Sequence, residues 1–183
     1  MLGHIEHCLD ELDRWRHLAA DPDAVETALW FHDAVYETDR RDNEERSAGL
    51  ADEALAEAGI DEARRARIVD LVMATRHDAP AADPFRRLAD DRLIADIDLA
   101  ILGADPAGFD RYESAIRREY AAVPAELFRA GRAAVLHRFL NRRAIYATDE
   151  FRSLYESRAR TNLARSVAAP ATRRTPPAAG PTG

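Results

Sequence analysis

Residues 93–102 read Leu-Ile-Ala-Asp-Ile-Asp-Leu-Ala-Ile-Leu, an almost wholly apolar stretch that contains two aspartates. Its length and apolar character predict a helix that faces the core of a helical protein. A carboxylate buried in such a helix is costly unless a cation or strong hydrogen-bond donors replace the lost water. We therefore expect at least one of Asp96 and Asp98 to bind a metal ion, while the other could cap a helix or pair with an arginine.

The rest of the chain also has the apolar spacing of amphipathic helices. Capping and helix-breaking residues divide these helices at Asp21-Pro22-Asp23, the Asp42 to Glu45 capping box, Gly59, Asp61, Asp105-Pro106, Pro124 and Asp149. The first helix is expected over 4–20, the second reaches Val35, the fifth ends near Gly103, and the one after Pro124 runs to about Tyr146. A loop is expected at 78–84. No strand pattern occurs, so we predict an all-α, single-domain helical bundle over 1–166 and a disordered tail over 167–183, rich in Pro, Ala, Thr and Gly.

The composition excludes several classes of chemistry. The 183 residues contain one cysteine, Cys8, and no lysine. An internal disulfide, a thiolate zinc cluster, a Schiff-base lysine and a Walker-type phosphate loop are therefore ruled out. No stretch is long and apolar enough to span a membrane, and the first residues do not resemble a secretory signal. We therefore expect a cytoplasmic protein.

Charge is distributed unevenly along the chain. The net charge is −7, yet residues 1–60 carry −11 and residues 111–183 carry +8. The acidic half suits a cation, and the arginine-rich half suits a small anionic, phosphate-bearing substrate. The alternative is that these are solvated helix faces that pair with one another. The negative total and the lack of a recognition motif argue against nucleic-acid binding.

A histidine–aspartate pair interrupts a second apolar stretch. Residues 28–36 read Ala-Leu-Trp-Phe-His-Asp-Ala-Val-Tyr, which places His32 and Asp33 where burial is expected. Imidazole and carboxylate together are common ligands of divalent transition metals. His4 adds a histidine at the start of the first amphipathic helix. His4, His32-Asp33 and a distant aspartate, each on its own helix, can converge in the core of a bundle.

The order histidine, His-Asp doublet, distant aspartate resembles the HD-domain superfamily of metal-dependent phosphohydrolases. Within it, the chain is similar to the bacterial group described as predicted metal-dependent HD superfamily phosphohydrolases. The resemblance covers about residues 2–166. Its motifs are His4-Ile5, the stretch 30–36, Asn43-Glu44-Glu45 with Ser47, 74–77, 94–103, 116–120, Gly131-Arg132, Glu156, Ala159-Arg160 and Asn162-Leu163.

The resemblance implies a role for several individual residues. His4, His32, Asp33 and one of Asp96 and Asp98 would bind the metal, and Asp98 is favoured. Asp96 would then be a supporting or alternative ligand. Two further roles are implied: His77 would contact the substrate or a second metal, and Glu44 would contact a second metal or a water. A plain carboxylate in the first turn of a helix is the alternative for Glu44.

The expected reaction is hydrolysis of a phosphate ester, with a nucleotide as one substrate class. Two histidines and two carboxylates suit Mn, Fe, Co or Ni, and Asp33 would orient the attacking water. His77 and Arg76 are further catalytic candidates. The arginines expected to bind the phosphate are Arg76, Arg117, Arg118 and Arg132.

Two other functions stay open at this point. A two-iron oxygenase of the HD type would need further ligands such as Glu44 and His77. A non-catalytic module would bind a nucleotide or a partner protein, and a homodimer formed through an arginine-rich helix face also stays open. A helix that begins at His4 leaves backbone N–H groups uncapped. We therefore expect the native protein to carry an additional amino-terminal segment, unless another part of the bundle covers this helix end.

Overall fold

The computed structural model describes residues 2–38, 40–77 and 88–168. Eight α-helices account for most of these residues, and the described part of the chain contains no β-strand. The helices are α1 (Leu2–Trp15), α2 (Pro22–Phe31), α3 (Asn43–Glu57), α4 (Glu62–Ala74), α5 (Ala89–Leu99), α6 (Pro106–Glu119), α7 (Ala125–Leu140) and α8 (Asp149–Ala168). The prediction of an all-α protein is confirmed.

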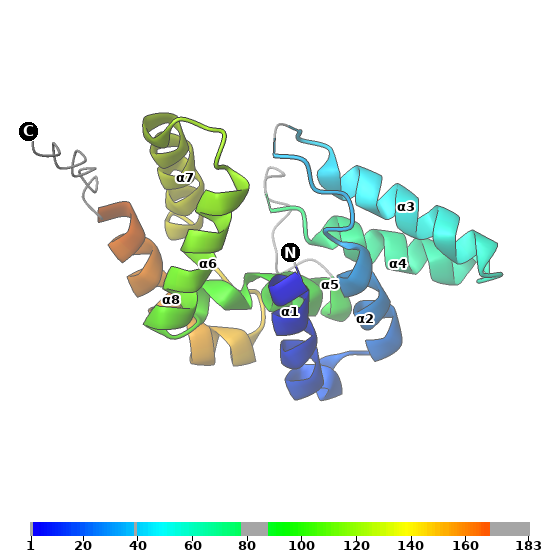
Figure 1. The fold of residues 1–183 in the computed structure, drawn as a ribbon. Helices are drawn as coiled ribbons and strands as arrows, with labels where there is room; N and C mark the ends of the chain where they lie inside the picture. Colours follow the sequence, from blue (N-terminus) through cyan, green and yellow to red (C-terminus); the bar gives the residue numbers. More distant parts are fainter. Residues whose placement is uncertain (1, 39, 78–87, 169–183) are drawn as a thin grey trace, which may run out of the picture.

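The helices form two groups on either side of a central segment (Figure 1). The central segment consists of α5 and the short 3-10 helix η3 (Ala100–Gly103) that continues it. On one side, α3 packs against α4 and α4 against α2, while α1 packs against α2 and α5. On the other side, α8 packs against both η3 and α7, and α6 also packs against η3.

One continuous apolar core joins the two groups. It runs from Cys8 on α1 through Ile94 and Ile97 on α5 to Phe109 on α6 and Leu163 on α8. All five of these side chains are buried. Because α5 contributes buried residues on several faces, its carboxylates are surrounded by protein, as the apolar stretch 93–102 predicts.

Most helix starts lie where the capping residues predict them. The side chains of Asp21, Asp61 and Asp105 accept hydrogen bonds from backbone N–H groups in the first turns of α2, α4 and α6. Gly59 ends α3 with a φ of 77°, a left-handed conformation that favours glycine. Asp42 precedes α3 as expected, but it makes no capping bond, because its carboxylate pairs with Arg40 instead.

Three helices are shorter than the apolar spacing predicts. The first ends at Trp15 and continues as the 3-10 turn η1 (Arg16–Leu18), and the second ends at Phe31 rather than Val35. The seventh ends at Leu140 rather than near Tyr146. In the last case the N–H groups that follow are bound by a side chain, since Glu156 accepts from the N–H groups of Ile145 and Tyr146.

Two expectations fall on residues outside the described part of the chain. These are the loop at 78–84 and nearly all of the tail, residues 169–183. The last helix extends through Ala168, so residues 167 and 168 belong to α8 rather than to the tail. Among the described helices, none combines the length and apolar character needed to cross a membrane.

Candidate metal centre

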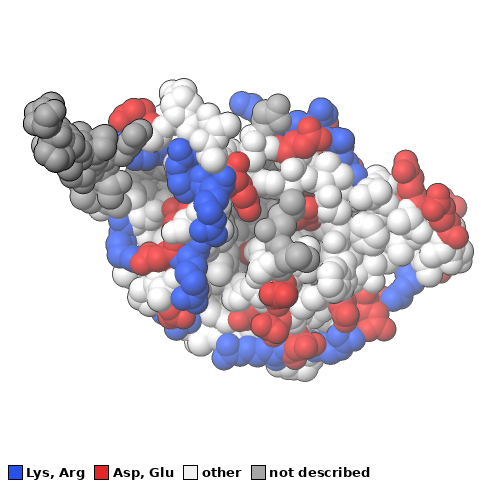
Figure 2. Space-filling model, in the orientation of Figure 1, with Lys and Arg blue, Asp and Glu red and all other residues white. Residues whose placement is uncertain are grey.

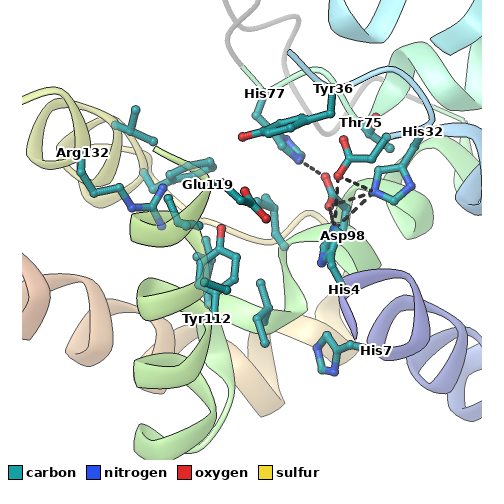
Figure 3. A pocket seen from close by; sticks show the side chains of 18 of the residues that line it. His4, His7, His32, Tyr36, Thr75, His77, Asp98, Tyr112, Glu119 and Arg132 are labelled. Atoms are coloured by element: carbon teal, nitrogen blue, oxygen red, sulfur yellow. Dashed lines mark hydrogen bonds and ion pairs between the residues drawn. The ribbon is translucent and has the colours of Figure 1, made fainter. Parts of the chain in front are cut away.

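Three separate segments bring the candidate ligands together. His4 lies in the first turn of α1, on the same face as the buried Cys8 one turn later. His32 is the C-cap of α2 and is 3% exposed, and Asp33 follows it immediately. Asp98 lies in the last turn of α5, between Ile97 and Leu99 of the core. The side chains of His4, His32 and Asp98 point toward one another between the helices (Figure 3).

The distances match those between ligands of one metal ion. The Nε2 atoms of His4 and His32 are 3.2 Å apart. Nε2 of His4 lies 2.9 Å from Oδ1 of Asp98 and 4.0 Å from Oδ2 of Asp33. Nε2 of His32 lies 3.6 Å from an oxygen of each aspartate. Ligand bonds of about 2.0–2.2 Å around a common centre give ligand separations of this size. The four residues that the sequence indicates as ligands are therefore in one cluster.

The buried His32 is oriented so that its Nε2 atom is available to a metal ion. Nδ1–H of His32 donates to the carbonyl oxygen of Leu29 at 2.7 Å, which leaves the lone pair of Nε2 directed at the cluster. Burial lowers the pKa of His32, but Asp98 and Asp33 outweigh it and raise the pKa to about 9. Burial raises the pKa of Asp98, whereas hydrogen bonds from three histidines lower it to well below its usual range. A proton on His32 thus offsets part of the carboxylate charge when no cation is bound.

Cys8 is also part of this cluster. One atom each of His4, Cys8, His32 and Asp98 lies within 4.8 Å of the others, a group that could hold a metal ion. The sulfur is 3.9 Å from Nδ1 and 3.7 Å from Nε2 of His4. These nearly equal distances place it against the imidazole ring rather than in line with the Nε2 lone pair. Burial, together with Asp98 and Asp33, raises the pKa of the thiol, which favours its neutral form. The four-residue spacing from His4 is the sequence signal for this contact.

The other aspartate of α5 serves a different purpose, so its proposed role as a supporting or alternative ligand is corrected. Asp96 is 1% exposed and accepts from the N–H of Ala147 and from the N–H and hydroxyl of Thr148, each at 2.7 Å. These groups lie directly before α8. Burial raises the pKa of Asp96 to about 6 against the effect of these donors, so the carboxylate is ionised at neutral pH. The alternative that one aspartate caps a helix holds for Asp96.

His77 lies beside the cluster, next to the second oxygen of the shared aspartate. Its Nε2 is 2.7 Å from Oδ2 of Asp98, whereas His4 contacts Oδ1. Arg142 donates to the carbonyl oxygen of His77 at 2.8 Å, and the ring of Phe139 packs against the imidazole. Glu44 lies on the wall of the same cavity without belonging to the cluster.

A cavity of about 990 Å³ opens above the cluster and separates it from α6 and α7. Figure 2 shows basic side chains gathered along one edge of this hollow. Arg118 and Arg132, two of the four arginines expected to bind phosphate, line the cavity. Arg132 pairs with Glu113 at 2.5 Å and lies over the ring of Tyr112. Arg118 and Arg132 come from the basic part of the sequence, but the lining also includes Arg40 and Arg41 from the acidic part.

The other two predicted arginines lie outside the cavity lining, which corrects their assignment. Arg76 pairs with Glu45 on α3. Arg117 donates to the carbonyl oxygens of Tyr120 and Val123, where it stabilises the turn after α6. Arg76 therefore interacts with a carboxylate on α3, and Arg117 with neighbouring backbone groups. The position of Arg76 outside the cavity lining gives no support to the catalytic role expected for it.

Several lining residues escaped the sequence analysis. They include His7 on α1, Tyr36 before α3, and Arg111, Arg138 and Tyr112 on the far wall. His7 lies one turn beyond His4, a spacing that could have indicated a shared face. The arginines give no such signal, because their helices are rich in arginine on every face.

Comparisons of the chain with protein-family models, with curated proteins and with solved structures found no match. What the fold and the site define is an all-α protein of eight helices in its described part, with a group of His4, Cys8, His32 and Asp98 that could hold a metal ion. Any statement about its reaction depends on the chemistry of these residues.

Proposed function

We propose that the protein is a divalent-metal-dependent phosphohydrolase of the HD-domain type. One observation carries the proposal. His4, His32, Asp33 and Asp98, which are spread over 95 positions of the sequence, come together at an arginine-lined cavity, where Nε2 of each histidine lies within 4.0 Å of an oxygen of each aspartate. This is the ligand set that the histidine, His-Asp and aspartate order implies. A surface ion pair would not need a buried imidazole, that of His32, and a half-buried one, that of His4, with their Nε2 atoms 3.2 Å apart.

The donor set fits a first-row transition metal. Two imidazoles and two carboxylates suit Mn, Fe, Co or Ni better than the all-oxygen site that Mg²⁺ prefers. A divalent metal bound there would supply Lewis acidity, which makes a water acidic and polarises a phosphoryl oxygen. The bond between His32 and the carbonyl of Leu29 supports the site, since fixing the tautomer makes an imidazole a better ligand.

The remaining groups suit phosphate chemistry. Asp33 is the more exposed carboxylate of the cluster, with 30% of its side chain accessible against 15% for Asp98. It can therefore accept a proton from a water that enters from the cavity. Arg118 and Arg132 also line the cavity and would offset the negative charge of a phosphate-bearing substrate.

A two-iron oxygenase is the second candidate. The observation that favours it is the position of Asp98, whose two oxygens face His4 and His77 respectively. A carboxylate shared in this way could bridge two metals. Metal analysis of the freshly purified protein separates the candidates, because two irons per chain support the oxygenase and one divalent ion supports the hydrolase. Absence of any bound metal supports a binding module without catalysis.

The experiment that tests the proposal is a metal-supplemented screen against phosphate esters and nucleotides. His32→Ala and Asp33→Ala should each abolish metal binding and hydrolysis. His17→Ala and His137→Ala are the matched controls, because both imidazoles are exposed and lie outside the cavity. Full metal occupancy in Asp33→Ala would refute the site. A metal-loaded protein that hydrolyses no phosphate ester would refute the reaction.

A further inference from the structure

The arginines on the cavity wall differ in whether their charge is already neutralised. Arg132 is paired with Glu113, and Arg40 with Asp42. Arg111 and Arg118 on α6 and Arg138 on α7 also line the cavity. These three, here called the free arginines, make no side-chain hydrogen bond or ion pair with any residue that the structure describes, and the same holds for Arg41, which lines the cavity just before α3.

Most arginines in the described part of the chain make a side-chain hydrogen bond or an ion pair, and exceptions away from the cavity, such as Arg92, Arg143 and Arg158, are scattered over separate segments. Away from the cavity, arginines commonly pair with carboxylates, as Arg64 does with Asp21, Arg65 with Asp52 and Arg165 with Asp110. Surface pairs of this kind form easily and contribute little to stability. Three charges left without partners on one concave wall therefore indicate a place where an anion from outside the chain can bind.

The nearest acidic groups offset this charge only in part. Asp105 also lines the cavity, and hydrogen bonds from the N–H groups of Gly108 and Ala107 lower the pKa of its carboxyl group, with a smaller contribution from Arg111, to which it makes no direct ion pair. Glu119 lies toward the metal cluster, between it and Arg132 in Figure 3. Arg111 and Arg118 are seven residues apart, which is two helical turns, so both side chains lie on the same face of α6.

The cavity is also larger than a single phosphate requires. About 990 Å³ is at the upper end of the range for sites that hold drug-sized ligands, roughly 300–1,000 Å³. The rings of Tyr36, Tyr112 and Tyr120 also line the cavity. Such a lining suits a flat or cyclic scaffold better than an extended chain.

From these observations we infer that the substrate carries two phosphate groups on a cyclic scaffold. One phosphate lies at the metal cluster, and the free arginines of α6 and α7 bind the second. The guanidinium group suits this role, because it presents paired donors that match phosphate oxygens. This inference rests on the proposed function, since it takes the metal cluster as the site of the first phosphate.

The test uses two probes that no phosphohydrolase can cleave. Phenylphosphonate carries one phosphonate on a benzene ring, and para-benzenediphosphonate carries two. Calorimetric titration of the Mn²⁺-loaded full-length chain should give a dissociation constant at least about tenfold lower for the diphosphonate, equivalent to about 1.4 kcal/mol. The ratio should approach one when Arg111, Arg118 and Arg138 are all replaced by alanine.

Arg129→Ala is the matched control for the triple variant. Arg129 lies on α7, pairs with Glu126 and is not part of the cavity lining. Its removal should leave the preference for the diphosphonate intact. Far-ultraviolet circular dichroism and Mn²⁺ affinity of the triple variant show whether it is folded and keeps the metal cluster.

The outcomes separate this inference from the proposed function. Equal affinity for the two probes in the wild-type protein would overturn the inference, even if phosphate esters are hydrolysed. A preference that survives in the folded triple variant would overturn it as well. A preference that depends on the free arginines, in a protein that hydrolyses no ester, would support the second anion site and refute the hydrolase.

Discussion

Replacing each aspartate of α5 by asparagine should separate metal binding from stability. Asp98→Asn removes a carboxylate that lies within 3.6 Å of three histidines. Loss of a group that merely supports a ligand typically weakens a metal site by 10–100-fold. Loss of a charged ligand should exceed this range. We expect Mn²⁺ affinity to fall by at least about 100-fold, or about 2.7 kcal/mol.

Asp96→Asn should lower the stability of the protein and leave its metal affinity unchanged. An asparagine has one acceptor oxygen, whereas Asp96 accepts from Ala147 with one oxygen and from Thr148 with the other. At least one buried N–H group then loses its partner, and the charge-assisted bonds weaken. We expect a loss of roughly 2–4 kcal/mol of stability, because each unsatisfied buried group costs about 1–3 kcal/mol. For a chain of this length, Tm should fall by roughly 5–15 °C.

Thermal unfolding with and without metal measures both effects together. Mn²⁺ at about 100 times its dissociation constant should stabilise the wild-type protein by about 2.7 kcal/mol. Asp96→Asn should start from a lower Tm and keep this gain, while Asp98→Asn should lose the gain. If Asp96→Asn instead lost metal affinity without a loss of stability, the assignment of the two carboxylates would be reversed.

Three further predictions concern protons, packing and sulfur. The raised pKa of His32, about 9 against an ordinary 6.5, means that its imidazole is protonated at pH 7 in the metal-free protein. Metal binding should then release about one proton, and metal affinity should rise with pH up to about pH 9. Calorimetry in two buffers can measure both. Without metal, the stability that this proton contributes should decline between pH 6.5 and 9. In Gly103→Ala the new methyl carbon would lie 2.6 Å from Cβ of Tyr155, so chemical denaturation should show a loss of about 1–3 kcal/mol. Gly131→Ala meets no atom within 4 Å and should gain about 0.5–1 kcal/mol. Cys8→Ala should keep a metal affinity within about tenfold of the wild-type value. The cobalt-loaded wild-type protein should lack a thiolate charge-transfer band. The presence of this band would show that Cys8 is a ligand.

The helices could be predicted largely because the sequence marks their ends. Asp21-Pro22, Asp61 and Asp105-Pro106 start helices by local hydrogen bonds, which need no knowledge of the rest of the chain. The end of α7 is set differently. The N–H groups of Ile145 and Tyr146 bind Glu156, which lies on the next helix. A contact of this kind cannot be read from apolar spacing, so the helix was predicted too long.

The metal cluster could be predicted only in part, because contacts between distant segments also decide which residues face it. His32 and Asp33 stand out because charge within an apolar stretch needs compensation. Asp96 and Asp98 stand out equally, and only the positions of their partners show which one faces the histidines. The arginines could not be sorted at all, because an arginine that binds a neighbouring carbonyl, such as Arg117, has the same sequence environment as one that lines a cavity.

The two aspartates of α5 lie two residues apart, which turns their side chains about 200° from each other around the helix axis. Asp96 accepts a hydrogen bond from the N–H group of Thr148, directly before α8, and Asp98 lies among the histidines of the metal cluster. Inserting or deleting a single residue between them would rotate one carboxylate by about 100° and lose one of the two contacts. The docking of the arginine-bearing half and the geometry of the metal cluster therefore depend on the register of the same two-residue interval.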